Sequence, residues 1–174
     1  MGNHNFAKSK IFVITVILIF SCAVMFFSCA AETPAAINLK DLVDAIGEKI
    51  DLSDAVEYSS EQIKNNYGIT TEDAVEMIVL KKIDETNVSN AEVLIILQAH
   101  DTAKAKEIEN KLKEHKTYKL KELENYAVNP DNERQYYIVD DSEMIIEGQY
   151  VFWAAHHQNK EINDIIKDYI KNNK

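Results

Sequence analysis

The side chains best suited to chemistry are two neighbouring histidines, His156 and His157, which stand shortly before Glu161 and Asp164. Imidazole and carboxylate groups together bind transition-metal ions or move protons in catalytic sites. Both histidines follow a predicted strand, however, and successive side chains on a strand point to opposite faces. The two rings would then be separated. We therefore expect exposed histidines at the end of a strand, with no metal site and no catalytic residue.

The sequence lacks the motifs of the well-known enzyme classes. No serine stands in a Gly-x-Ser-x-Gly or Ser-x-x-Lys pattern, and His-Glu-x-x-His is also missing. With only 4 glycines the chain has no glycine-rich loop for phosphates or dinucleotides, so we expect no cofactor. These observations favour a non-enzymatic protein. The alternative is an envelope hydrolase or metal-dependent enzyme that uses scattered acids and histidines, such as His100, His156 and His157.

Aromatic side chains gather in a predicted hairpin over residues 144–153, whose two-residue turn is Gly148-Gln149. Alternation along the second arm places Tyr150 and Trp153 on opposite faces. Such rings belong to a core more often than to a ligand platform. A small-ligand carrier, a further alternative, would need an apolar pocket beside these two residues. The candidate binding residues are Tyr150, Trp153, His156 and His157.

The N-terminal segment has the composition of an export signal. Residues 1–10 are polar and contain two lysines, whereas residues 11–31 contain no charged residue and end in small side chains. This order is typical of secretory signals. If a lipoprotein peptidase cuts before Cys29, the exposed thiol receives a lipid. Ordinary cleavage after Ala30 or Ala31, and an uncleaved membrane-spanning anchor, are the alternatives.

These features divide the chain into three parts. Residues 1–28 are a signal peptide of the lipoprotein type or a membrane anchor, residues 29–37 are a short linker, and residues 38–174 are a single domain. We expect the domain to be extracytoplasmic and attached to the cell membrane, through lipid on Cys29 or through the uncleaved apolar segment. Because no cysteine follows Cys29, the domain has no internal disulfide and depends on its core.

The charge of the chain narrows the range of partners. The formal net charge is −10 at pH 7, and residues 1–28 contain basic residues but no acidic one. Nucleic acid is bound through basic residues that neutralise phosphates, so it is not an expected partner. The acidity favours solubility, and the alternative is an acidic surface for a cationic partner or a divalent ion. The expected partners are the membrane and an envelope protein.

Hydrophobic spacing predicts an α+β fold. The strand over residues 91–99 is apolar on both faces and is therefore expected to be covered on both sides. The many Lys and Glu residues of the long helix are expected to form a solvated face with ion pairs. We expect a four-stranded, mostly antiparallel sheet packed by helices. Helices are predicted over residues 38–50, 59–68, 101–125, 130–139 and 159–172, with a helical turn over 70–75, and strands over 76–83, 91–99 and both arms of the hairpin.

Several features follow one another in a familiar order. They are a lipoprotein-like start, the Glu92–Ile96 strand, a charged helix over residues 106–112, Tyr126, and Gly148 with Tyr150 and Val151. In this order the chain resembles the domain-of-unknown-function family 4358 of bacterial lipoproteins, from about Leu39 to His157. The resemblance implies no activity, substrate or catalytic residue. Our leading hypothesis is a non-enzymatic lipoprotein whose domain binds another protein or an envelope component close to the membrane.

The first prediction concerns maturation at Cys29. In its native host we expect the protein to lose residues 1–28, gain the mass of a lipid and partition with membranes. Because the lipid is attached through the thiol, Cys29→Ala should not gain that mass. Intact mass spectrometry with membrane fractionation measures both properties. A wild-type mass equal to that of the uncleaved chain would show instead that the apolar segment is retained as an anchor.

Overall fold

The computed structural model describes residues 36–83, 90–125 and 130–173. The predicted export signal, Cys29 and Tyr126 lie outside these ranges. The chain divides into two units, residues 1–33 and 34–174, and the elements described here belong to the second. Among the described residues, no helix has both the length and the apolar character needed to cross a bilayer.

Five strands form one antiparallel sheet in the order β1-β2-β3-β5-β4. The α+β class and the antiparallel sheet are thus confirmed. β3 lies at the centre, paired with β2 and β5, as its two apolar faces predict. The hairpin is also confirmed, because Glu147 pairs with Tyr150 across Gly148-Gln149. The strands are β1 (Ala55–Glu57), β2 (Ala74–Lys82), β3 (Val93–Ala99), β4 (Met144–Glu147) and β5 (Tyr150–Ala155).

The predicted number of four strands is wrong, since β1 adds a fifth at the edge beside β2. This strand has three residues, and its one large apolar side chain, Val56, is 51% exposed. Such a segment carries no hydrophobic period, so pairing with β2 alone makes it a strand. The helical turn predicted over residues 70–75 stops at Asp73, whose carboxylate accepts a hydrogen bond from the Thr70 N–H at 2.9 Å. Val75 belongs to β2 instead.

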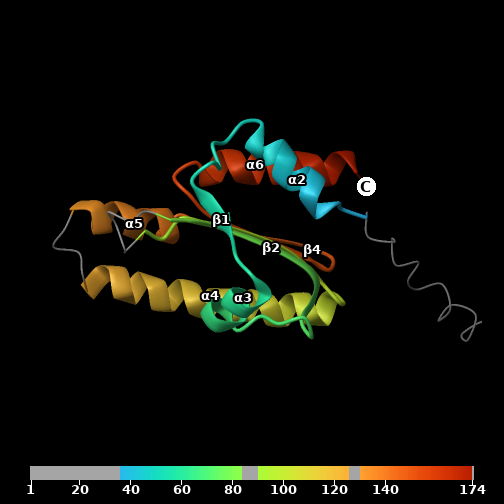
Figure 1. Ribbon diagram of the computed structural model, residues 1–174, viewed down its shortest axis with the longest axis horizontal. Helices are drawn as coiled ribbons and strands as arrows, with labels where there is room; N and C mark the ends of the chain where they lie inside the picture. Colours follow the sequence, from blue (N-terminus) through green and yellow to red (C-terminus); the bar gives the residue numbers. More distant parts are fainter. Residues whose placement is uncertain (1–35, 84–89, 126–129, 174) are drawn as a thin grey trace, which may run out of the picture. The chain divides into compact units, whose positions relative to one another are not determined.

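Helices cover both faces of the sheet (Figure 1). One face is covered by α2 and α6, whose apolar stripes pack against Leu94, Ile96 and Phe152. The other is covered by α3 and α4, which pack against Ile95 and Trp153 among others, and α5 packs on α4 and adds Ile138 and Val139 to the same core. The domain is therefore three layers thick, with two separate cores. The helices are α2 (Leu39–Gly47), α3 (Ser60–Tyr67), α4 (Thr102–Asn125), α5 (Pro130–Asp140) and α6 (Asn159–Asn172).

Short polar side chains begin the helices where the sequence predicts. The Asn38 side chain accepts hydrogen bonds from the first N–H groups of α2, and Ser59 forms a capping box with Gln62 at the start of α3. α3 ends at Gly68, whose φ of 67° favours glycine. The Asp101 side chain accepts the Lys104 N–H at 2.8 Å and so caps α4 at the predicted helix start.

Burial of the central strand should dominate stability, which a matched pair of isoleucines tests. Ile95 on β3 is 0% exposed, whereas Ile83, just after β2, is 50% exposed. Ile95→Ala leaves a cavity and should lower the free energy of unfolding by about 2–5 kcal/mol. Ile83→Ala should change it by less than about 0.5 kcal/mol. Urea denaturation measures both, and equal losses would contradict the assignment of β3 to the core.

Candidate functional site

The structure separates the two aromatic residues proposed for binding. Tyr150 lies on the α2/α6 face, 2% exposed, and its ring stacks with that of Phe152. Its hydroxyl accepts a hydrogen bond from the Ile37 N–H at 3.1 Å. Ile37 is itself buried, so the core of the domain already includes the last residue of the predicted linker. Tyr150 is a core residue that fixes the start of the domain.

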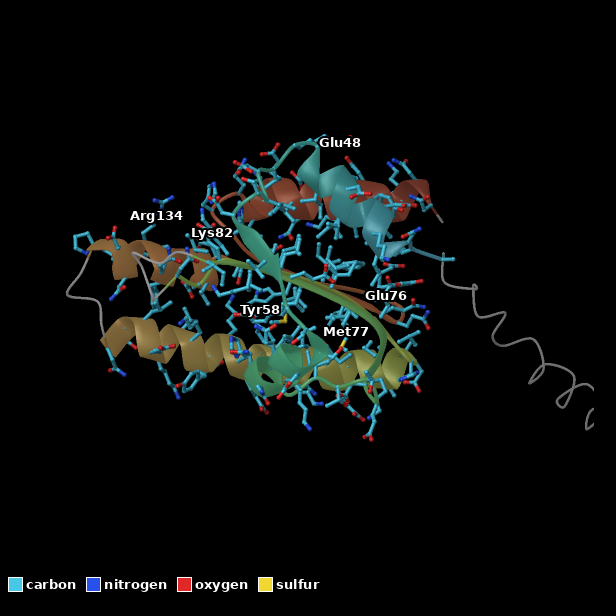
Figure 2. The ribbon with its side chains drawn as sticks, in the orientation of Figure 1. Glu48, Tyr58, Glu76, Met77, Lys82 and Arg134 are labelled. Carbon is cyan, nitrogen blue, oxygen red and sulfur yellow. The ribbon has the colours of Figure 1, made fainter. Side chains whose placement is uncertain are left out.

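Trp153 lies on the opposite face of β5. Its indole N–H donates to the Ser142 hydroxyl at 2.8 Å, and that hydroxyl donates to the Val139 carbonyl at 2.6 Å. The ring is 1% exposed, yet it borders a groove of about 690 Å³. The groove lies on the face of the sheet that α3 and α4 cover, where Figure 2 labels Tyr58. Of the four predicted binding residues, Trp153 alone lines it.

Polar and aromatic side chains line this groove, which we call the α4 groove. On α4 its lining residues Lys111, His115 and Lys119 recur every four positions, which places them on one stripe of the helix. Part of the charged face expected to be solvated therefore faces a hollow. Other lining side chains come from α3, β2 and the loops; they include Tyr58, Asn65, Asn66, Tyr67, Lys81 and Asn90.

Three neighbouring rings, tilted against one another, form the inner wall of the α4 groove. The ring centroid of His115 lies 4.6 Å from that of Tyr67 and 6.1 Å from that of Trp153. Burial lowers the pKa of His115, and it raises the pKa of Tyr67. Both side chains are therefore neutral at neutral pH, and the wall offers ring faces and neutral polar atoms to a ligand.

Three ammonium groups add positive charge to the same groove. Lys111 pairs with Asp73 at 2.8 Å and Lys119 with Glu122 at 2.9 Å. Lys81 is bound differently, because among the described residues its ammonium donates to two backbone carbonyls, those of Asn90 at 2.6 Å and Glu92 at 3.0 Å. Burial, with the nearby Lys119, lowers the pKa of Lys81 to about 8. An anionic group in the groove would offset the unfavourable burial of this charge.

A second polar cluster surrounds Glu92, which directly precedes β3 and is 3% exposed. Its Oε1 lies 3.3 Å from Nδ1 of His157, and its Oε2 lies 3.5 Å from Nε2 of His156. The ammonium of Lys82 stands 3.6 Å from Oε2. In Figure 2, Lys82 and Arg134 mark this end of the domain, opposite Glu76. We call this set the Glu92 cluster.

The expectation that His156 and His157 point to opposite sides is wrong. Their ring centroids are 4.1 Å apart, and both rings approach the same carboxylate. The reason is that β5 ends at Ala155, so both histidines lie in the bend before α6, where strand alternation no longer applies. Burial lowers the pKa of His156, and the carboxylate of Glu92 opposes this effect. His157 is the exposed member of the pair.

The remaining side chains considered for chemistry do not join this cluster. His100 contacts the Thr71 carbonyl through Nε2 at 2.9 Å. Glu161 accepts a hydrogen bond from the Gln158 side chain at 3.2 Å. Neither this acid nor Asp164 belongs to the group whose ligand atoms converge, which consists of Glu92, His156 and His157. Of the three histidines considered for chemistry, His156 and His157 therefore lie close together, and their partner is Glu92, an acid that was not among the predicted site residues.

A weak signal for this role was present in the sequence. Glu92 stands directly before five apolar residues of a strand that is buried on both faces, so its carboxylate had to be buried or lie at the rim of the sheet.

The fold and the two polar sites define a small three-layer α+β domain with a groove on one face. The chain belongs to the family described as domain of unknown function, DUF4358, whose model matches residues 48–156. Comparisons with curated proteins and with solved structures gave no match.

The matched segment contains every residue that lines the α4 groove, together with Glu92 and His156. It contains all five strands and the helices α3, α4 and α5. The helices α2 and α6 of the other layer lie outside it. The family model thus covers the sheet and the layer that carries the groove.

The burial of His115 predicts a pH effect on stability. Its folded-state pKa lies below the ordinary value, so in mild acid the unfolded chain binds a proton that the folded chain does not. The free energy of unfolding should therefore fall as the pH decreases below about 6.5. His115→Phe keeps a ring but cannot titrate, so its stability should fall less over that range. Urea denaturation at pH 7.5 and 5.5 tests this, and an identical pH dependence in both proteins would contradict it.

Proposed function

We propose that the protein is an extracytoplasmic lipoprotein, tethered to the membrane, whose domain is a non-enzymatic binding module. The α4 groove is the proposed binding site. The single observation that carries this proposal is that ammonium groups and ring faces line one hollow in a chain whose net charge is −10. The proposed ligand is an anionic part of another envelope protein or of an envelope component.

The chemistry of the groove supports such a ligand. Lys81 uses two of its three N–H donors on carbonyl oxygens among the described residues, which leaves one for a ligand. Tyr118, at the mouth, is 66% exposed and offers a ring to the incoming group. Rings and hydrogen-bond donors at such positions fix the orientation of a bound molecule. Two carboxylates also line the groove, those of Glu114 and Glu122, which suits a ligand that carries polar groups besides its charge.

The tether rests on the sequence. The apolar run over residues 11–31, which contains Cys29 near its end, supports export and lipid attachment. The acidity of the rest of the chain disfavours binding to nucleic acid. A short stretch separates Cys29 from the buried Ile37, so an attached domain would lie close to the bilayer. The ligand is therefore expected in the envelope near the membrane surface.

The alternative of a small-ligand carrier finds less support. It required an apolar pocket beside both Tyr150 and Trp153, and these residues lie on opposite faces of the sheet. The hollow beside Trp153 is lined by polar and charged groups as well as by apolar ones, so it is not the apolar pocket that this alternative requires. For the alternative of a metal-dependent enzyme, one specific observation counts in favour, namely the convergence of His156 and His157 on Glu92.

The sole tryptophan of the chain provides the test, since Trp153 borders the groove. Full-length protein in detergent is titrated with two probes, acidic peptides and anionic glycan fragments of the envelope, while tryptophan fluorescence is followed. We expect a saturable change with one probe class that weakens as salt rises. Lys119→Gln should weaken binding by about tenfold, the effect of losing one charge-assisted hydrogen bond. Tyr118→Ala should weaken it by about the same factor, because the ring contact with the ligand is lost.

Matched controls lie close by on the surface. Lys121→Gln removes a lysine two residues away on α4 that does not line the groove, and Tyr137→Ala removes an exposed tyrosine of α5. Both should bind like the wild type. Binding that is equally affected by the control and groove variants would reject the groove as the site, and no saturable response to either probe would reject the proposed ligand class.

A further inference from the structure

We propose that Glu92, His156 and His157 form a binding site for a divalent transition-metal ion, for which Zn²⁺ is a suitable probe. The site is distinct from the α4 groove and does not depend on the function proposed for it. The inference rests on the positions of three side chains, on a buried carboxylate oxygen without a hydrogen-bond partner, and on the chemistry of the donors.

The spacing of the donor atoms fits a single ion. Bonds of about 2.0–2.1 Å in tetrahedral geometry place neighbouring ligand atoms about 3.3–3.4 Å apart. Glu92 Oε1 lies 3.3 Å from His157 Nδ1, and Glu92 Oε2 lies 3.5 Å from His156 Nε2. One ligand atom from each of the three residues lies within 4.8 Å of the other two. Small side-chain rotations therefore bring all three into one coordination shell.

The carboxylate is incompletely satisfied without a cation. Among the described residues, Oε2 of Glu92 is buried and has no hydrogen-bond partner. The nearest cationic or imidazole nitrogens, on His156 and Lys82, stand at 3.5 and 3.6 Å. Charge-assisted hydrogen bonds are shorter, about 2.7–2.9 Å. Because buried polar atoms are almost always paired, this oxygen marks a position where a ligand is expected.

The donor set selects the class of metal. Two imidazole nitrogens and one carboxylate suit Zn²⁺ and its first-row neighbours, whereas Ca²⁺ and Mg²⁺ prefer oxygen ligands alone. Three protein ligands leave a position for water or another molecule. His157 also lines a hollow of about 430 Å³ that Arg134 and Tyr137 border, so solvent reaches the site from this side.

Metal binding would change the tautomer of His156. In the structure its Nδ1 accepts a hydrogen bond from the Gln158 N–H at 3.1 Å, so the neutral ring carries its proton on Nε2. Coordination through Nε2 moves this proton to Nδ1, where it would face the Gln158 N–H. The hydrogen bond must then break. Gln158 directly precedes α6, and its carbonyl accepts a hydrogen bond from the Ile162 N–H at 3.1 Å, so the loss concerns its own N–H and not the start of the helix.

Lys82 opposes the metal, because its ammonium occupies space beside Oε2 and carries the same sign of charge. Its side chain is 33% exposed and can move into solvent. Removing this charge should therefore strengthen metal binding. A purely structural role for Glu92 gives no reason for such a gain, so Lys82→Gln separates the two explanations.

The experiment is a titration of the full-length protein in detergent with Zn²⁺, in a buffer without chelators, by isothermal calorimetry. We expect one ion per chain with micromolar or tighter affinity. Glu92→Gln and His157→Ala should each weaken binding at least tenfold, and Lys82→Gln should strengthen it several-fold. His157 is exposed, so its replacement leaves the fold intact. The matched control is His100→Gln, which removes a histidine outside the cluster and should bind like the wild type.

A second measurement follows the Gln158 amide by NMR with hydrogen exchange. Saturation with Zn²⁺ should speed its exchange and shift its resonance, since its acceptor is lost. The proposal is overturned if Zn²⁺ does not bind saturably, or if binding is unchanged in both Glu92→Gln and His157→Ala. If Glu92→Gln fails to fold, the test rests on His157→Ala and Lys82→Gln. A Zn²⁺ affinity that is unchanged in both of these variants also overturns the proposal.

Discussion

Burial of both faces of β3 is the constraint on which the rest of the architecture depends. Its seven residues alternate so that Ile95 and Leu97 face one layer of helices and Leu94 and Ile96 the other. A strand of this kind is stable only if helices cover it from both sides and strands pair with both edges. The chain meets this requirement with segments from before and after β3. The two cores share the central strands and no helix.

The same constraint creates the polar chemistry at one end of the sheet. Lys81 and Lys82 are neighbours on β2, so alternation sends one ammonium to the α4 groove and the other to the Glu92 cluster. Glu92 contacts both: its backbone carbonyl accepts from Lys81, while its carboxylate lies near Lys82. A polar group at this rim that lacks a partner is costly in a low-dielectric interior. The two candidate sites are therefore linked through one residue.

How much of this was predictable depends on the range of the interactions. Period-two alternation correctly predicted that β3 is buried on both faces and that Tyr150 and Trp153 lie on opposite faces. The predicted helix starts at residues 38, 59 and 101 coincide with the residues that cap α2, α3 and α4. β1 was missed because its pairing is tertiary. The meeting of Glu92 with two histidines 64 and 65 residues later depends on the register of β3 against β5, in which Val93 pairs with Ala155. No local pattern encodes that register.

The first and last helices of the domain lie in the same layer, where the Tyr169 hydroxyl donates to the Asn38 carbonyl at 3.4 Å. The ends of the folded unit thus meet at one place, away from the helices that border the groove. The entropy lost on closing a short loop between neighbouring ends is small. The order of the elements along the chain is therefore not essential to the fold. A circularly permuted chain, joined there and opened at the Gly148–Gln149 turn, would have the same three layers and the same groove.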